Sequence, residues 1–455
     1  MASRRGLALL VAPLLILAAC TESATPPQPT APPDAFAPTP TIGPSTTTRP
    51  APTTTVDVER AVIQRVDPHT LEPLPGFEPI AMGDGFWGSR PSPSGRYFGV
   101  TVSHDNGLNE IRLIDVEEWQ QVASWAEYAD SEIQVTDDAT LYFLRGEQVR
   151  LLSPGDTNSQ IVGDLPSGSS TWAGPEASPN GRFNFVGTRS LGSDGTQEAF
   201  VSIVDPSTGQ VTQVDLPEVR VGAVDPVSQG PWAGYLYNSP SFSWDRGANR
   251  LLAVHAHEDV VSEVDLGSGV ATEHDFPGPG VDPSTGTRRW STLSPEGGVL
   301  YVSSTDVTLI EDDDTWSVTT TPAGVVAVDT DTWEVVARTD APISDIHLSP
   351  AGDRLVASGY ETEEGQLVYR TNSSGLFLLD PTDLSTLAHL EPESPDQGYW
   401  PITFNEDAGV AYVSTWIGVQ RIDAIDMSTG EVLATAENQV FLDMIGSVGV
   451  LGSTR

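Results

Sequence analysis

The feature that most constrains this chain is a short phrase, apolar–apolar–Asp–x–x–Thr/Ser–Gly, that returns along its length. Its clearest copies begin at Asp205, Asp265 and Asp426, and each reaches glycine four residues later. The looser copies carry Asp67, Asp115, Ser153, Asp329 and Asp380 at the same place. Eight copies at a mean spacing of about 51 residues are typical of repeat architectures.

Each copy of the phrase lies inside a larger pattern of short apolar runs and turns. In the third unit, the turn at 178–181 is followed by runs at 182–187, 200–205 and 211–215. Runs rich in Val, Ile and Phe with period-two alternation predict strands. Ser-Pro-x-Gly and Asp-x-x-Thr-Gly are turn sequences, because Pro presets φ and Gly permits positive φ. The pattern predicts units of four strands, A to D, joined by tight turns.

The A–B turn and the B strand recur with recognisable residues. Ser-Pro-x-Gly turns begin at Ser92, Ser294 and Ser349, and Tyr-Val pairs follow at Tyr301 and Tyr412. These residues resemble the YVTN-type β-propeller repeat family, whose repeats combine such a turn with Tyr-Val and a later Ile-Asp-x-x-Thr-Gly. The resemblance implies an all-β fold, a single β-propeller of four-stranded blades over residues 57–455. It implies little about function, because propellers host unrelated activities.

The two ends of the repeat region each supply half a blade. Residues 62–78 provide the Asp phrase and an outer strand, whereas 441–455 provide an A strand and a B strand. Joining the halves closes the ring and leaves no unpaired inner edge. We therefore favour eight blades, closed by the N- and C-terminal half-blades. Seven is the alternative, reached if the weak second unit, 131–165, merges with a neighbour.

Residues 1–20 have the pattern of an export signal. Two arginines precede a short apolar run, which ends in Leu-Ala-Ala-Cys and resembles the bacterial lipobox. The resemblance implies a lipoprotein signal peptide that is cleaved before Cys20, the chain's single cysteine, which is then lipidated. A plain secretory signal is the alternative. Residues 21–56 form a disordered Pro/Thr-rich linker with little to bury. We expect an exported protein anchored by lipid on the outer side of the bacterial cytoplasmic membrane or in the cell envelope.

The chain is strongly acidic. It carries 63 Asp and Glu against 22 basic residues, all of them Arg, for a net charge of −41. A field of this sign repels phosphate backbones, so nucleic acid is not an expected partner. A need for solubility or a saline habitat explains this charge, and no functional acidic patch is required.

Aromatic residues gather in the connections from each D strand to the next A strand. These connections share one face of a propeller with the B–C loops. They carry Trp87, Trp172, Trp232, Trp290 and Trp400, and Arg288 and Arg289 precede Trp290. We predict a ligand-binding rim for a glycan, small molecule or protein on this face. Inter-blade packing is the alternative use of these tryptophans.

Acidic and histidine clusters are weaker candidates. The longest B–C loops, 306–322 and 361–375, should be neighbours, and the first contains Asp312, Asp313 and Asp314. These carboxylates are weak candidates for Ca²⁺, since their spacing matches no calcium loop; otherwise no metal, cofactor or catalytic residue is predicted. His255, His257 and His274 fall in one unit, where a hydrogen-bonded structural role is favoured over a metal site. Asp345 and His347 should point toward the channel as an acid–base pair.

The sequence thus predicts a cell-surface, lipid-anchored β-propeller that acts as a non-catalytic binding or scaffolding module. A lactonase-like, metal-dependent hydrolase is the alternative, and an envelope-assembly component is a second alternative. Whether the protein is an enzyme stays open, although the balance favours no catalysis. Neither a Gly-x-Ser-x-Gly elbow nor a cysteine nucleophile occurs in the chain.

Overall fold

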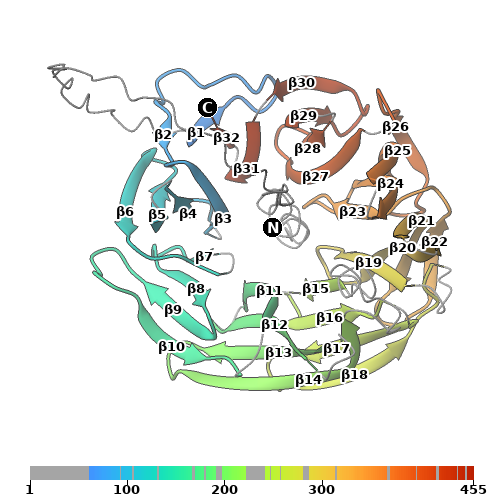
Figure 1. Ribbon diagram of the computed structural model, residues 1–455, viewed down its shortest axis with the longest axis horizontal. Helices are drawn as coiled ribbons and strands as arrows, with labels where there is room; N and C mark the ends of the chain where they lie inside the picture. The colour runs from blue at the N-terminus through green and yellow to red at the C-terminus, as the bar shows by residue number, and fades with distance from the viewer. Residues whose placement is uncertain are drawn as a thin grey trace, which may run out of the picture.

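The strands form a ring of sheets around a centre, and the protein is an all-β β-propeller (Figure 1). The computed structural model describes residues 61–92, 94–104, 107–130, 133–166, 170–178, 181–190, 197–221, 241–245, 247–256, 258–279, 286–312, 315–365, 369–395, 397–416, 420–437, 439–445 and 448–454. Within them every named element is a strand, β1 to β32. No described segment forms a helix long and apolar enough to cross a membrane.

The first half of the ring contains four sheets of four consecutive strands. One comprises β3 (Gly85–Pro91), β4 (Tyr97–Ser103), β5 (Asn109–Asp115) and β6 (Gln120–Trp125). The next comprises β7 (Gln134–Val135), β8 (Leu141–Arg145), β9 (Gln148–Leu152) and β10 (Gln160–Asp164). The third comprises β11 (Ser170–Ala177), β12 (Phe183–Ser190), β13 (Gln197–Asp205) and β14 (Gln210–Val221). The fourth comprises β15 (Ser241–Asp245), β16 (Arg250–Val254), β17 (Val260–Asp265) and β18 (Val270–Asp275).

The second half contains one eight-stranded sheet and two sheets of four strands. The eight-stranded sheet joins β19 (Gly286–Leu293), β20 (Val299–Asp312), β21 (Thr315–Asp329), β22 (Val335–Thr339), β23 (Asp345–Leu348), β24 (Leu355–Gly365), β25 (Tyr369–Leu379) and β26 (Thr386–Leu390). The next comprises β27 (Gly398–Asn405), β28 (Val410–Trp416), β29 (Gln420–Asp426) and β30 (Val432–Glu437). The last comprises β31 (Gln439–Ile445), β32 (Val448–Thr454), β1 (Ala61–Val66) and β2 (Ile80–Ala81).

The last sheet is built from both ends of the chain. Strand β1 pairs with β32 in antiparallel register, with Ala61 opposite Thr454 and Val66 opposite Gly449. The C-terminal segment supplies the inner strands β31 and β32, and the N-terminal segment supplies the outer strands β1 and β2. The pairing joins the two complementary half-units that the sequence contains.

The repeated Asp phrase is the turn between the C and D strands. In the copy at Asp426, the carboxylate oxygen Oδ1 accepts the backbone N–H groups of Ser428 (2.8 Å) and Thr429 (2.9 Å). The N–H of Gly430 donates to the carbonyl of Asp426 at 2.8 Å. Both carboxylate bonds recur at Asp67, Asp115, Asp265 and Asp329. Asp205 and Asp380 accept the N–H of the residue two positions on. The phrase recurs because each turn needs a carboxylate to accept its backbone donors.

The fifth residue of this turn adopts a left-handed conformation in every copy that begins with Asp. Glycine supplies it at three positions, where φ is 71°, 73° and 77°. Four copies place a larger residue there, with φ between 51° and 59°: Leu71, Trp119, Trp333 and Leu384. Leu71, Trp119 and Leu384 are buried. Their burial offsets the steric cost of positive φ, which explains why the looser copies lack glycine.

The tyrosines of the Tyr-Val pairs tie neighbouring units together. The hydroxyl of Tyr301 in β20 donates to the carbonyl of Pro381 at 3.1 Å, and that of Tyr412 in β28 donates to Pro68 at 2.9 Å. Each proline follows the Asp of the C–D turn in the next unit around the ring. Burial raises the pKa of Tyr301 to about 12. The Tyr412 bond also connects the last repeat to the N-terminal segment.

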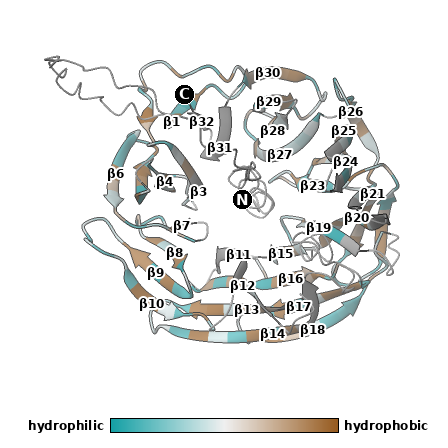
Figure 2. Cartoon of the chain, viewed as in Figure 1, coloured by the Kyte–Doolittle hydropathy of each residue, from teal (hydrophilic) through white to brown (hydrophobic). Residues whose placement is uncertain are grey.

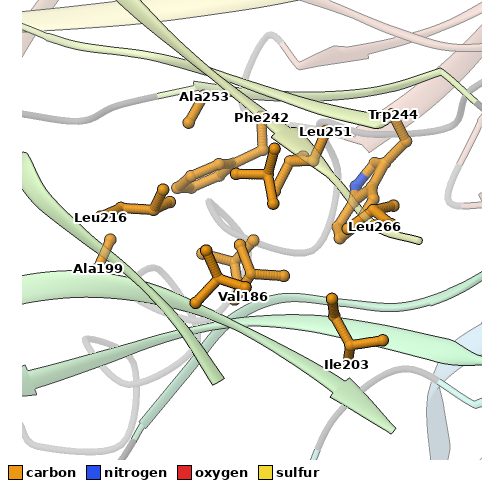
Figure 3. Close-up of a cluster of buried hydrophobic side chains, with 12 residues drawn as sticks. Val186, Ala199, Ile203, Leu216, Phe242, Trp244, Leu251, Ala253 and Leu266 are labelled. Carbon is orange, nitrogen blue, oxygen red and sulfur yellow. The ribbon is translucent and has the colours of Figure 1, made fainter. Parts of the chain in front are cut away.

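The hydrophobic core is divided into wedges between adjacent sheets. One cluster combines Val186 and Ile203 from one sheet with Phe242, Trp244 and Leu251 from the next (Figure 3). Hydrophobic and hydrophilic residues follow one another along the strands (Figure 2). Because side chains alternate between the faces of a strand, each sheet packs apolar residues against its two neighbours.

The predicted long loops at 306–322 and 361–375 are corrected by the structure, which places most of these residues in strands. Strands β20 and β21, and likewise β24 and β25, continue as hairpins beyond the length of their neighbours. The two hairpins pair edge to edge, with Thr319 opposite Glu363. The hydroxyls of Thr320 and Thr362 form a 2.7 Å hydrogen bond across this seam. Runs of Val and Thr favour such extended structure over loops.

Candidate functional site

Two of the five predicted rim tryptophans meet on one face of the ring. We define the mouth face as the face that carries the starts of β19 and β27 and the tips of the two long hairpins. Trp290 lies on β19 and Trp400 on β27. Their ring centroids are 6.1 Å apart and the ring planes meet at 84°, an edge-to-face contact. Both side chains are half-buried. Trp290 and Trp400 are 110 positions apart in the sequence, and the structure brings them together.

The inner strand between them in the ring, β23, is short. Strand β23 has four residues, Asp345–Leu348, whereas β19 and β27 have eight each. Trp290 packs against the hydrophobic cluster that includes Ile343, just before β23, and Ile346 on β23.

The two arginines before Trp290 face opposite sides of β19. Arg289 is fully buried and bonds to the preceding sheet: its guanidinium donates to the carbonyls of His255 (3.0 Å) and Glu258 (2.7 Å), and it pairs with Asp259 at 2.8 Å. Burial lowers the pKa of Arg289, and the carboxylate of Asp259 opposes that shift. Arg289 thus serves as an internal tie between sheets.

Successive side chains of a strand point to opposite faces, so Arg288 lies on the other side of β19 from Arg289 and on the same side as Trp290. It is half-buried. Of the predicted basic pair, Arg288 is therefore the one on the side of the tryptophan contact.

The structure does not describe the side chains of the other predicted site residues. Trp87 lies in β3 and Trp172 in β11, but their side chains are outside the described part of the structure. Cys20, Trp232, Asp313 and Asp314 lie outside the described residues, as does the side chain of Asp312 at the end of β20. Within the described part of the chain, no group of three or more His, Cys, Asp and Glu side chains is arranged to hold a metal ion.

The histidines singled out in the sequence have separate partners. The ring of His255 is buried and its Nε2 lies 2.9 Å from the hydroxyl of Ser262. His274 stacks on Trp333 with centroids 4.2 Å apart, and its Nε2 lies 3.0 Å from Glu263. His257 lies outside the described residues. These contacts fit a structural role for His255 and His274.

His347 and Asp345 form a close pair on β23, with Nε2 of His347 3.3 Å from Oδ2 of Asp345. Asp345 is 1% exposed, and its other oxygen, Oδ1, has no hydrogen-bond partner among the described residues. Leaving a carboxylate oxygen buried without a donor is costly.

Sequence reasoning missed two more residues with the same property. Ser358 pairs with Asp345 across β23 and β24, and its hydroxyl has no partner among the described residues. Gln397, just before β27, is fully buried, with its side-chain N–H₂ group likewise unpartnered. A polar residue within or next to an apolar strand is the local signal, and it does not reveal which side chains lie near it in the fold.

No family model and no curated protein matches the sequence. Several solved structures are similar to this chain at low identity. Dihydro-heme d1 dehydrogenase NirN matches at 15% identity over 83% of this chain and 73% of that chain, with a TM-score of 0.45. An oligogalacturonate lyase in complex with manganese matches at 10% identity, over 87% and 90%, with a TM-score of 0.44. Quinohemoprotein alcohol dehydrogenase from Comamonas testosteroni matches at 10% identity, over 84% and 69%, with a TM-score of 0.46.

Proposed function

We propose that this β-propeller is a non-catalytic binding or scaffolding module that uses its mouth face. The observation that carries the proposal is the contact between Trp290 and Trp400 across the short strand β23. Two half-buried aromatic rings in contact provide a stacking surface for an apolar or sugar-like ligand. Arg288 lies on the same side of β19 and adds a donor for a polar group.

We further propose that the ring contains eight YVTN-type blades. The eight-stranded sheet divides naturally into β19–β22 and β23–β26, which the β21–β24 seam joins on the mouth face. The weak second unit supports this count, because residues 134–164 form a four-stranded sheet of their own.

The binding test compares Trp290→Ala and Trp400→Ala with the unchanged full chain in detergent. A screen of glycans and small acids should find a ligand, and both variants should lose its binding. Trp290 packs against the core, so its truncation should also lower stability, toward the ~3–5 kcal/mol typical of buried aromatics. Trp400→Ala should lower the free energy of unfolding by less than Trp290→Ala does. Thermal melts and binding titrations measure the two effects.

The matched control is Trp333→Phe, because Trp333 lies in a C–D turn on the opposite face. This variant should keep ligand binding. Large melting losses in both alanine variants with no ligand found would assign the two tryptophans to packing and contradict the proposed function. A tightly held stoichiometric metal together with hydrolysis of lactones would favour the enzymatic alternative instead.

The proposed location is the cell surface, with the protein anchored through a lipid on Cys20. Cys20→Ser removes the thiol that the lipobox modifies. We expect this variant to leave the membrane fraction and to appear in the soluble or secreted fraction. Metabolic labelling with a fatty acid and fractionation of cells measure both results. Unchanged membrane partitioning of the variant would show that another element holds the protein.

A further inference from the structure

Strand β20 continues beyond the strand that pairs with it on one side. The pairing of β19 with β20 reaches no further than Gly286, which lies opposite Val307. From Thr308 to Asp312, β20 pairs with β21 on its other side. Among the described residues, no strand pairs with the β19 side of β20 over this stretch. We call the backbone of residues 308–312 on that side the free edge.

The free edge faces the centre of the ring. Strand β19 is the inner strand of its sheet, and the free edge lies on the side of β20 from which β19 pairs (Figure 1). A strand added there continues the line of β19 across the mouth face. The opposite edge of the joined hairpins belongs to β25 and lies on the side of the outer strand β26. On β25 the N–H of Ser373 already donates to the carbonyl of Pro395, at 2.6 Å.

The seam with β24 holds the free edge in an extended form. Strand β21, which carries the hairpin, pairs with β24 from Ser317 to Thr320. The N–H of Thr362 also donates to the hydroxyl of Thr320 at 3.1 Å. The register between β20 and β21 is continuous from Thr305 to Asp312. A strand that is already fixed in its bound form loses little conformational freedom when a partner adds to it.

The free edge has little protection against strand addition. Exposed edge strands are usually blocked by Pro, Lys or a bulge, and the stretch Thr308-Leu309-Ile310 contains none of these. Alternate residues of a strand direct their N–H and C=O groups to the same side, so the free edge offers about four to six backbone hydrogen bonds. An extended peptide uses such groups when it joins a sheet as an additional strand.

The charge of the chain restricts which strand can be added. Strand β20 ends in Glu311 and Asp312, and two further aspartates follow in the sequence. A second copy of this chain brings the same acidic sequence and a net charge of −41, so pairing between two copies is opposed by repulsion. A basic segment is attracted to the same place.

We infer that the free edge of β20 binds an extended, basic polypeptide segment of a partner protein by strand addition. This inference rests on the proposed binding function of the mouth face and names its class of partner. The segment pairs its backbone with residues 308–312 and brings Lys or Arg side chains to the acidic end of the hairpin.

The test selects a displayed library of random ~10-residue peptides on the full chain in detergent. Selection at ~0.15 M salt limits weak surface electrostatics. We expect the enriched peptides to be basic, rich in β-branched residues and free of Pro at their centres. Versions with Glu in place of Lys and Arg should bind about tenfold more weakly, as should versions with N-methyl groups on alternate amides.

Two shortened hairpins form a matched pair of variants. The first joins Thr308 to Thr319 through an Asn-Gly turn and so removes the rest of the free edge. The second joins Glu363 to Arg370 in the same way and leaves β20 intact. Both remove the same two residue pairs of the β21–β24 seam. We expect the first to weaken peptide binding about tenfold or more and the second to bind like the unchanged chain.

A charge reversal tests the same edge without shortening it. The double variant Glu311→Lys with Asp312→Lys keeps the backbone and should weaken binding of the basic peptides about tenfold. Thermal melts of all variants identify any that fail to fold, and the double variant then replaces the first shortened hairpin in the comparison.

Three results overturn the inference. The library may enrich no peptide, it may enrich acidic or Pro-rich peptides, or the enriched peptides may bind equally to both shortened hairpins. None of these results touches the proposed function, which the ligand screen with Trp290→Ala and Trp400→Ala decides separately. Conversely, loss of peptide binding only in the first shortened hairpin supports the inference even if that screen finds no ligand.

Discussion

At the scale of single residues, the aspartates of the C–D turns contribute most clearly to the fold. Hydrogen bonds from the turn to each carboxylate lower its pKa at Asp67, Asp205, Asp265, Asp329 and Asp426. A lowered folded-state pKa means that the ionised form stabilises the fold. That contribution is complete above the unfolded pKa of about 4 and is lost as the pH falls through the folded value.

The variant Asp426→Ala tests this contribution in one turn. It leaves two backbone N–H groups without their acceptor, and we expect a loss of about 1 kcal/mol at pH 7. The difference from the unchanged chain should shrink as the pH falls from about 4 through the lowered folded-state pKa, because the carboxylate is protonated first in the unfolded chain and then in the native one. Urea unfolding of both proteins across this pH range measures the difference in their free energies of unfolding. Glu431→Ala, an exposed carboxylate beside the same turn, is the control. A difference that is constant with pH would contradict the role of the charge.

These turn residues are the part of the fold that sequence reasoning predicts well. The bonds of Asp426 run to residues two and three positions away, so a local pattern contains the whole interaction. The contact between Trp290 and Trp400 could not be predicted in this way. It joins residues 110 positions apart in the chain, and no local pattern indicates which distant residues meet.

At the scale of strands, tyrosine bonds and paired hairpins connect neighbouring units. Sequence reasoning predicts the Tyr-Val strand but not the destination of the hydroxyl, which lies 80 residues away at Pro381. It also predicts that the long connections at 306–322 and 361–375 are neighbours, but it does not predict that they form strands. Strand pairing between β21 and β24 is non-local, and the Thr and Val residues that favour it are common in loops as well.

The variant Tyr301→Phe isolates one inter-unit bond. It leaves the carbonyl of Pro381 buried without its donor, and we expect a loss of about 1–3 kcal/mol in the free energy of unfolding. Tyr142→Phe is the control, because Tyr142 holds the equivalent position on β8 and packs on Phe183. Chemical denaturation of both variants compares them. Equal and negligible losses would show that the tyrosine hydroxyl does not strengthen the ring.

At the scale of the whole molecule, stability depends on joining the two chain ends. Strand β32 pairs with β31 on one side and with β1 on the other. Deletion of residues 448–455 removes that strand and exposes an edge on each neighbour. We expect the whole ring to lose stability, well beyond the ~1 kcal/mol of a typical point change, as a lower melting temperature of the full chain shows. A truncated protein that melts like the unchanged chain would contradict closure by the two ends.

The direction of β1 also determines where the chain enters the ring. Ala61 pairs with Thr454 at the end of β32, so β1 begins on the mouth face of the ring. If Cys20 carries the lipid, the anchor is attached on the side of Trp290 and Trp400, and a Pro-rich tether allows a separation of up to ~100 Å. The tether then leaves the ring on the same side as the mouth and keeps the mouth within that distance of the membrane. Molecules confined to the membrane surface would meet it at a raised effective concentration.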